Sequence, residues 1–147
     1  TCMAASDSLF VDSNFFIALF HQEDALHERA MGIAKTLDTQ PRSLVISNFI
    51  FLEVVTVLSQ KKSRVQARAA GQYFLHDPGI VIRHVDERLQ QTSWEIFQTV
   101  SRKGVSFVDC STIALMRSEG IRTLLTFDST DFKSLQKPFR FSIYHSD

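Results

Sequence analysis

Short apolar runs that alternate with helix-like stretches constrain the fold of this chain more than any other feature. Residues 9–11, 44–46, 80–82 and 123–126 are short, mostly apolar runs, which is typical of buried strands. Between them, apolar residues recur at helical spacing. Parallel strands need such helical crossovers, so the pattern predicts an α/β fold in which a mainly parallel sheet is covered on both faces. We expect three layers, α/β/α, with about five strands in the central sheet.

Capping and turn signals bound the expected helices. These helices are predicted at residues 15–20, 24–37, 49–58, 63–76, 86–100 and 110–119. Asp77-Pro78-Gly79 marks a turn, and Gly120 ends the last of these helices. Two more β segments are predicted, at residues 105–108 directly before Asp109 and at residues 139–144. Residues 128–132 are typical of an Asx-type turn.

The composition fits one compact domain spanning residues 1–147. The chain has 44% hydrophobic and 22% charged residues, enough for one core and too little for two ordinary domains. We expect residues 1–6 to be disordered, with Thr1 and Cys2 an artificial remnant ahead of a natural start at Met3. No membrane span or signal peptide is recognisable, which favours a cytoplasmic protein. Cys110 is expected to be a core residue, unpaired with Cys2.

The formal net charge of +0 provides no global attraction toward nucleic acid, so any such binding would depend on local basic patches. Two groups of basic residues are candidates. They are Lys61, Lys62, Arg64 and Arg68 at one helix junction, and Arg102, Lys103, Lys133, Lys137 and Arg140 nearer the final strand. An ordinary solvated surface explains each group at least as well.

Four acids, Asp12, Glu53, Asp109 and Asp128, occupy unusual places in this pattern. Asp12, Asp109 and Asp128 each follow a predicted strand, whereas Glu53 interrupts an otherwise apolar helix. A parallel sheet gathers the carboxyl ends of its strands at one edge, so these acids can converge there and bind Mg²⁺ or Mn²⁺.

Each acid also has an ordinary structural explanation. Asp12 and Asp109 could cap helices, and Asp128 could form a turn. Glu53 could lie on a narrow solvent-facing stripe with Thr56 and Gln60; if it is buried instead, a cation or a hydrogen-bond donor must face its carboxylate.

Four motifs in this order resemble the PIN domain family, and within it the VapC-like toxins of toxin–antitoxin pairs. They are Phe-Val-Asp-Ser-Asn at 10–14, Ser-Asn-Phe-Ile-Phe-Leu-Glu at 47–53, Ser-Phe-Val-Asp-Cys-Ser-Thr-Ile-Ala at 106–114 and Thr-Phe-Asp-Ser-Thr-Asp-Phe at 126–132. A His-Glu-Arg-Ala stretch at 27–30 is a further, weaker similarity. The resemblance covers nearly the whole chain.

The resemblance implies an endoribonuclease that uses one or two Mg²⁺ or Mn²⁺ ions, a homodimer, and an antitoxin that covers the active-site groove. Asp12, Glu53 and Asp109 match the family's acidic positions directly. The last motif departs from the common pattern, because two residues separate its acids; Asp128 is the first choice as a metal ligand and Asp131 the alternative. Asn14 and Thr126 match polar positions that could orient a carboxylate or a metal-bound water.

Carboxylate-held divalent ions can supply both a nucleophile and charge relief for phosphodiester hydrolysis, so no histidine base is needed. The scattered histidines lack zinc-site spacing. The main alternative is a PIN-like binding or assembly module that binds no metal. A phosphorylation receiver is disfavoured, because no acidic pair precedes Asp12 and no lysine ends residues 123–127. A housekeeping RNA-processing enzyme would have the same motifs as a toxin.

Overall fold

The computed structural model describes residues 7–40 and 42–145, so the expectations for residues 1–6 lie outside the described residues. Its strands are β1 (Leu9–Val11), β2 (Leu44–Ser47), β3 (Ile80–Arg83), β4 (Thr123–Leu125) and β5 (Ser142–Ile143). Its helices are α1 (Ser13–Phe20), α2 (His27–Thr39), α3 (Asn48–Lys61), α4 (Arg64–His76), α5 (Glu87–Thr99), α6 (Phe107–Glu119) and α7 (Ser129–Phe139).

The sheet is fully parallel and has β1 at its centre. Its strand order is β3-β2-β1-β4-β5, with Phe10 paired to Val45 on one side and to Leu124 on the other. Every residue of β1 is buried, as expected for a strand covered on both faces. The predicted three-layer α/β/α fold with a five-stranded sheet is therefore confirmed.

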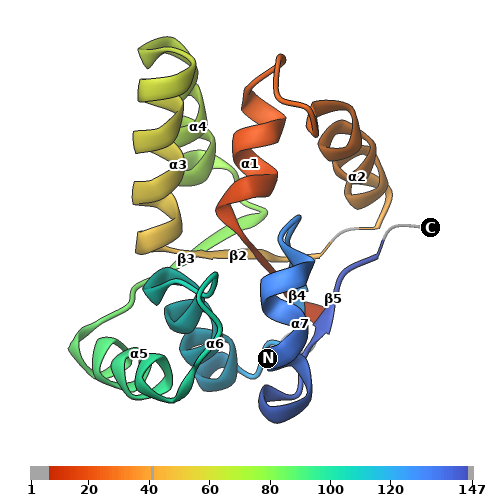
Figure 1. Ribbon diagram of the computed structural model, residues 1–147. Helices are drawn as coiled ribbons and strands as arrows, with labels where there is room; N and C mark the ends of the chain where they lie inside the picture. Colours follow the sequence, from red (N-terminus) through yellow and green to blue (C-terminus); the bar gives the residue numbers. More distant parts are fainter. Residues whose placement is uncertain (1–6, 41, 146–147) are drawn as a thin grey trace.

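The helices divide between the two faces of the sheet according to chain order. The chain runs from β1 outward to β2 and β3, and then returns past β1 to β4 and β5. With right-handed crossovers, this reversal places the helices of the two halves on opposite faces. Figure 1 shows α1 to α4 above the sheet and α5 to α7 below it. The reversal lies between β1 and β4, where ligands bind in open parallel sheets.

Aromatic rings from α1 and α4 pack against one another within the layer formed by α1 to α4. The Phe16 ring lies edge-on to Phe74 at 4.8 Å and to Phe15 at 5.2 Å between centroids. All three side chains are buried, and we call them the phenylalanine cluster. Phe15 and Phe16 on α1 are therefore covered within the chain, and Phe74 of α4 packs against Phe16.

Two predicted elements differ from the structure. Residues 105–108 form no strand, because the Ser106 hydroxyl caps a helix that begins at Phe107, three residues before the predicted start. Residues 129–139 form α7 in place of a turn, with Phe132 and Leu135 facing the core. The turn-forming residues of its first turn and Pro138 in its last turn conceal this helix in the sequence.

The remaining expectations about the core agree with the structure. Cys110 is a buried free thiol within α6, whereas Cys2 lies outside the described residues. Among the described residues, none of the helices has the length and apolar content that crossing a bilayer requires.

Candidate active site

Asp12 lies at the point where β1 becomes α1, beside the reversal of the sheet. Its backbone N–H donates to the Leu125 carbonyl at 2.9 Å, which fixes it against β4. Its side chain accepts a 2.8 Å hydrogen bond from the Ser13 N–H and caps α1. The side chain is only 6% exposed. The prediction that Asp12 caps a helix is therefore confirmed. Capping occupies one carboxylate oxygen and leaves the other for a different partner.

Thr126 supplies that partner and joins Asp12 to the segment after β4. The Thr126 hydroxyl donates to Asp12 Oδ2 at 2.8 Å and accepts from Asn14 Nδ2 at 3.2 Å and from the Asp128 N–H at 3.0 Å. Asn14 Oδ1 in turn accepts from the Phe127 N–H at 3.0 Å. Thr126 and Asn14 thus orient the Asp12 carboxylate and the turn that carries Asp128.

Glu53 extends from α3 toward the start of α1. The Ser13 hydroxyl donates a hydrogen bond to Glu53 Oε1, and the side chain is half-buried. A donor therefore faces this carboxylate, as its apolar surroundings required. Because Ser13 follows Asp12 directly, the same turn holds both acids.

Asp109 reaches the site from the first turn of α6, so the prediction that it ends a strand is wrong. Asp109 Oδ2 accepts from the Ser106 N–H at 2.9 Å, and Ser106 Oγ accepts from the Asp109 N–H at 3.1 Å. This reciprocal capping box fixes the side chain at the start of the helix. Its position at the carboxyl edge of the sheet is the predicted one, although a helix provides it.

Asp128 and Asp131 both lie in the segment that opens α7, but their surroundings differ. Asp131 accepts a 2.8 Å hydrogen bond from Arg102 Nε. Its carboxylate also lies against Gly104, so a Cβ at that position would collide with Asp131 Oδ1. Asp131 thus ties α7 to the loop between α5 and α6, whereas Asp128 is the acid whose charge acts on Asp109.

The carboxylates influence one another's ionisation. Burial raises the pKa of Asp12 to about 7, and the charges of Asp109 and Glu53 add to this rise while the Thr126 hydrogen bond opposes it. Burial also raises the pKa of Asp109, with contributions from Asp128 and Glu53. The pKa of Asp128 is raised by burial and by Asp131. The four predicted acids therefore form one interacting group, which holds a proton near neutral pH as expected for crowded carboxylates.

The chemistry of this group suits a hard cation, although the side chains do not form a closed ligand set as they stand. In residues 7–40 and 42–145, no three His, Cys, Asp or Glu side chains are close enough together to hold a metal ion. All the groups at this edge are oxygen donors, which Mg²⁺ and Mn²⁺ prefer. A cation would also replace the proton on the buried Asp12 and relieve the mutual repulsion.

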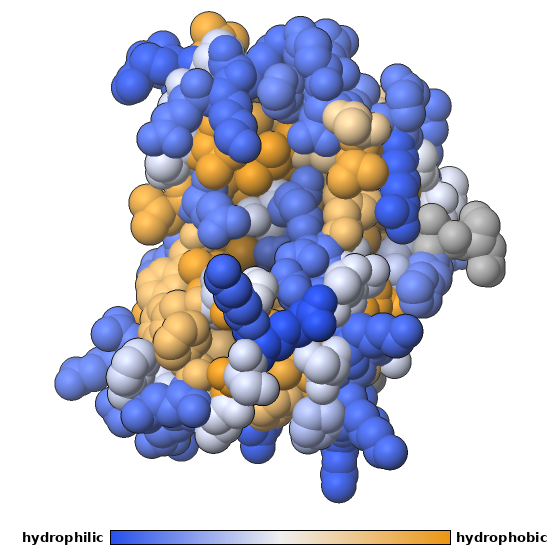
Figure 2. All heavy atoms as spheres, in the orientation of Figure 1, coloured by the Kyte–Doolittle hydropathy of each residue, from blue (hydrophilic) through white to orange (hydrophobic). Residues whose placement is uncertain are grey.

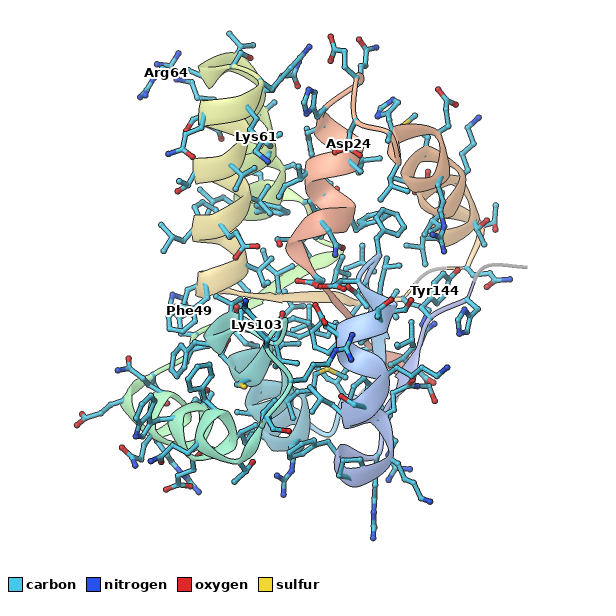
Figure 3. The ribbon with its side chains drawn as sticks, in the orientation of Figure 1. Asp24, Phe49, Lys61, Arg64, Lys103 and Tyr144 are labelled. Atoms are coloured by element: carbon cyan, nitrogen blue, oxygen red, sulfur yellow. The ribbon has the colours of Figure 1, made fainter. Side chains whose placement is uncertain are left out.

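The two predicted groups of basic residues lie in different places relative to the acids. Figure 3 shows Lys61 and Arg64 at the end of α3 far from the sheet, whereas Lys103 lies near the start of α6. Lys62 pairs with Glu23 at 2.7 Å. Only the group that contains Arg102 and Lys103 therefore borders the carboxylates, and Asp131 already engages Arg102.

Sequence reasoning did not assign roles to three residues that support the site. Ser106 could have been found, because a serine three residues before an acid is the pattern of a capping box. No local signal connects Ser13 to Glu53, which lies 40 residues away. The Arg102–Asp131 pair likewise joins segments 29 residues apart.

Comparison with known proteins agrees with this geometry. The PIN domain family matches residues 9–138. A curated relative, the "23S rRNA-specific endonuclease VapC20" of Mycobacterium tuberculosis strain H37Rv, is 32% identical over 127 residues, which cover 86% of this chain and 92% of the relative.

Solved structures extend the similarity to the fold. The crystal structure of Mycobacterium tuberculosis VapC20, described as a sarcin-ricin loop cleaving toxin, matches with a TM-score of 0.75 and 30% identity over 86% of this chain and 94% of that one. VapBC2 from Rickettsia felis, bound to a DNA fragment from its promoter, matches with a TM-score of 0.69 and 16% identity over 95% and 99%. This chain belongs to the PIN domain family and is a homologue of the VapC toxin endonucleases.

Proposed function

We propose that this protein is a divalent-metal-dependent endoribonuclease and the toxin of a toxin–antitoxin pair. The observation that carries the proposal is the buried Asp12 carboxylate, whose pKa of about 7 reflects burial and the nearby charges of Asp109 and Glu53. Keeping repelling acids at the ligand-binding edge of a sheet lowers stability, and such perturbed groups gather at functional sites.

Asp12, Glu53, Asp109 and Asp128 would hold one or two Mg²⁺ or Mn²⁺ ions. When bound, such ions make water more acidic and neutralise charge on a phosphodiester. Asp128 is preferred to Asp131 as a ligand because its charge acts on Asp109, whereas Asp131 is engaged by Arg102. Asp131 remains the alternative ligand.

The surrounding polar residues keep the acids in place. Thr126 holds one oxygen of Asp12 by its 2.8 Å hydrogen bond, and Ser13 holds Glu53. The Ser106 capping box holds Asp109. Asp12, Glu53 and Asp109 are therefore each held in one orientation, which lowers the reorganisation needed during the reaction.

The relatives support RNA as the substrate and an antitoxin as a partner. The curated relative VapC20 is described as specific for 23S rRNA, so a ribosomal RNA stem-loop is the first candidate substrate. Structures with a similar fold include a toxin–antitoxin complex from Klebsiella pneumoniae, with a TM-score of 0.62 and 19% identity over 94% of this chain and 96% of that one. We propose a corresponding antitoxin for this chain.

Exposed apolar side chains support the proposed homodimer. Leu52 on α3 is 64% exposed, and Trp94 and Phe97 on α5 are 47% and 37% exposed. Leu52 lines a groove of about 580 Å³ together with Phe49 and Phe107. The Phe97 ring packs against Phe107, and Trp94 stacks on Phe97. Figure 2 shows the apolar patch at the lower left over this region. A second copy would cover this surface. Sedimentation of the wild type and Leu52→Lys tests this, and equal masses would contradict it.

Cleavage of a panel of structured RNAs tests the enzymatic proposal. The panel contains a 23S rRNA stem-loop and tRNAs, each incubated with Mg²⁺, Mn²⁺ or EDTA. Asp109→Asn should lower the cleavage rate by about a thousandfold or more, since it weakens the charge stabilisation of the transition state. Asp38→Asn, the same change at an exposed position on α2, should leave the rate unchanged.

The same samples distinguish the proposal from a binding module that lacks metal. Thermal unfolding with Mn²⁺ should show a higher Tm for the wild type and a smaller increase for Asp109→Asn. A protein that cuts no RNA and gains no stability from Mn²⁺ is better explained as a non-catalytic assembly subunit. Metal binding without cleavage would refute the proposed ribosomal RNA and tRNA substrates and retain the metal site.

A further inference from the structure

Arg29 on α2 lies directly beside the segment that links two of the site residues. Its guanidinium carbon lies over the Phe127 ring, 5.0 Å from the ring centroid. Phe127 stands between Thr126 and Asp128 in the sequence. Arg29 is therefore held next to the turn that carries Asp128, although it comes from a helix almost 100 residues earlier in the chain.

Phe127 is a rigid support for this arginine. Its ring packs against the buried Phe15 at 6.0 Å between centroids, and its N–H donates to Asn14 Oδ1 at 3.0 Å. The backbone and the ring are thus both fixed to α1. A guanidinium over such a ring gains a cation–π contact and loses side-chain freedom before any ligand arrives.

The guanidinium N–H groups of Arg29 have no partner among the described residues. Within the part of the chain that the structure describes, Arg29 forms no ion pair and donates no hydrogen bond, and its side chain is exposed. A cation–π contact uses the charge of the guanidinium and none of its N–H donors. All five donors remain available for an anion, and their fork matches two phosphate oxygens.

The neighbouring acids favour a protein cation beside them if RNA is the ligand. Asp12, Glu53, Asp109 and Asp128 repel a phosphate backbone, and Asp131 already engages Arg102, the arginine on the α5–α6 loop. In Figure 1 the start of α7 lies between α2 on one side and the α5–α6 loop on the other. Arg29 is the cation that α2 places against Phe127, next to Asp128 in the chain.

We propose that Arg29, supported by Phe127, binds a backbone phosphate of the RNA next to the scissile bond. The inference rests on the proposed ribonuclease function, because it takes RNA as the ligand. It assigns Arg29 a role in binding and positioning the substrate, and it makes α2 one wall of the RNA path.

Arg117 provides a matched control. Its guanidinium lies 5.5 Å from the centroid of the Phe139 ring, so it has the same charge and the same kind of contact as Arg29. It belongs to the last turn of α6, eight residues after Asp109 and therefore roughly 12 Å along the helix from the site. Arg117→Gln removes the same charge without touching the proposed RNA path.

The experiment measures RNA affinity in EDTA by fluorescence anisotropy, with a labelled RNA stem-loop at several salt concentrations. Cleavage is then measured with Mn²⁺ on the same stem-loop. Arg29→Gln should weaken binding about tenfold and reduce the slope of log affinity against log salt by about 0.7, the loss of one phosphate contact. Arg29→Lys should keep the slope and recover part of the affinity. Arg117→Gln should match the wild type in both respects.

The outcomes separate this inference from the proposed function. If the wild type cleaves RNA but Arg29→Gln keeps the wild-type affinity and salt slope, Arg29 contacts no phosphate and the inference is overturned. Equal losses in Arg29→Gln and Arg117→Gln would also overturn it, since they would reflect net charge alone. If Arg29→Gln weakens binding but the wild type cuts no RNA, Arg29 contacts a phosphate as inferred, and the ribonuclease proposal is refuted.

Discussion

The phenylalanine cluster and the acidic edge both include residues from the short stretch between Asp12 and Phe16, yet they affect stability in opposite ways. Phe15 and Phe16 are buried against Phe74 with edge-on ring geometry, so they favour the folded state through apolar burial and ring packing. Three residues earlier, Asp12 is equally buried but carries an acid whose pKa is raised to about 7. Phe15 and Phe16 therefore stabilise the fold, whereas the nearby Asp12 belongs to the candidate active site.

This difference shows how the fold accommodates a site that opposes folding. Asp12 lies in the chain between the fully buried β1 and the phenylalanines of α1, so well-packed residues on both sides hold this buried acid in place. Substitutions in the two regions should have opposite signatures: those in the cluster should change stability at any pH, and those at the acidic edge should change activity and pH dependence.

Phe16→Ala should have the largest effect on stability. Removing a fully buried ring leaves a cavity between α1 and α4, and such changes cost about 3–5 kcal/mol. Urea unfolding followed by circular dichroism measures the loss in free energy of unfolding. Phe20→Ala, at a position on α1 that is only partly buried, is the control and should cost less; equal losses would show that the cluster is not a special source of stability.

The pH dependence of the metal-free protein should show the opposite behaviour of Asp12. Because its folded pKa is about 7 against an ordinary 3.8, the native state holds more protons than the unfolded chain between these values. The free energy of unfolding should therefore be highest below about pH 4, fall as the pH rises to about 7 and then level off. The loss from this group is on the order of 4 kcal/mol at most.

Urea titrations in EDTA between pH 4 and 8 measure this change. Asp12→Asn should flatten the profile, because the amide does not titrate and can still cap α1. Phe16→Ala should lower the whole profile without changing its slope. A wild-type profile that rises with pH over this range would mean that Asp12 is not held in its neutral form.

Thr126→Val should separate activity from stability. The change removes the donor to Asp12 Oδ2 and the acceptor for Asn14 but keeps the shape of the side chain. We expect a loss of about 10-fold to 100-fold in RNA cleavage, the usual effect of removing a group that orients a ligand. Single-turnover cleavage together with a Tm measurement tests this. A wild-type rate would show that the Thr126 hydrogen bond does not matter for the reaction.

Ser106→Ala should have the smallest effect. It removes the Ser106 hydroxyl from the capping box and should cost about 1 kcal/mol. Because the Ser106 N–H still donates to Asp109 Oδ2, cleavage should fall only modestly. Ser106→Thr keeps a hydroxyl at the same position and should restore stability. If it does not, the capping geometry at α6 is not the source of the loss.

Most of the fold could be predicted from the sequence because the central strands are largely buried on both faces. Runs such as Leu9 to Val11 then contain no polar residues, and their pattern is hard to mistake. The exceptions were residues 105–108 and α7. Phe107 and Val108 belong to a helix whose start depends on the Ser106 cap, and α7 contains turn-forming residues and a proline. In both places local capping and tertiary packing decided the structure.

The four acids could be proposed from their places at strand ends and in an apolar helix, and the structure shows that their charges interact. Their supports could not be predicted. The contacts of Ser13 with Glu53, Arg102 with Asp131 and Arg29 with Phe127 join residues distant in the sequence. Periodicity reports which face a residue lies on, but not which distant side chain it meets.

The parallel order of the sheet also sets when the molecule becomes complete during synthesis. β1 can pair with β2 once residue 47 has been made, but its second neighbour, β4, ends only at Leu125. The hydrogen bond from Thr126 to Asp12 can therefore form only after β4 has been synthesised, and the four acids cannot come together before Asp128 is available. A growing chain that stops short of β4 has an unpaired edge on β1 and no assembled site. Nascent chains of that length therefore combine an exposed strand edge with a complete lack of activity.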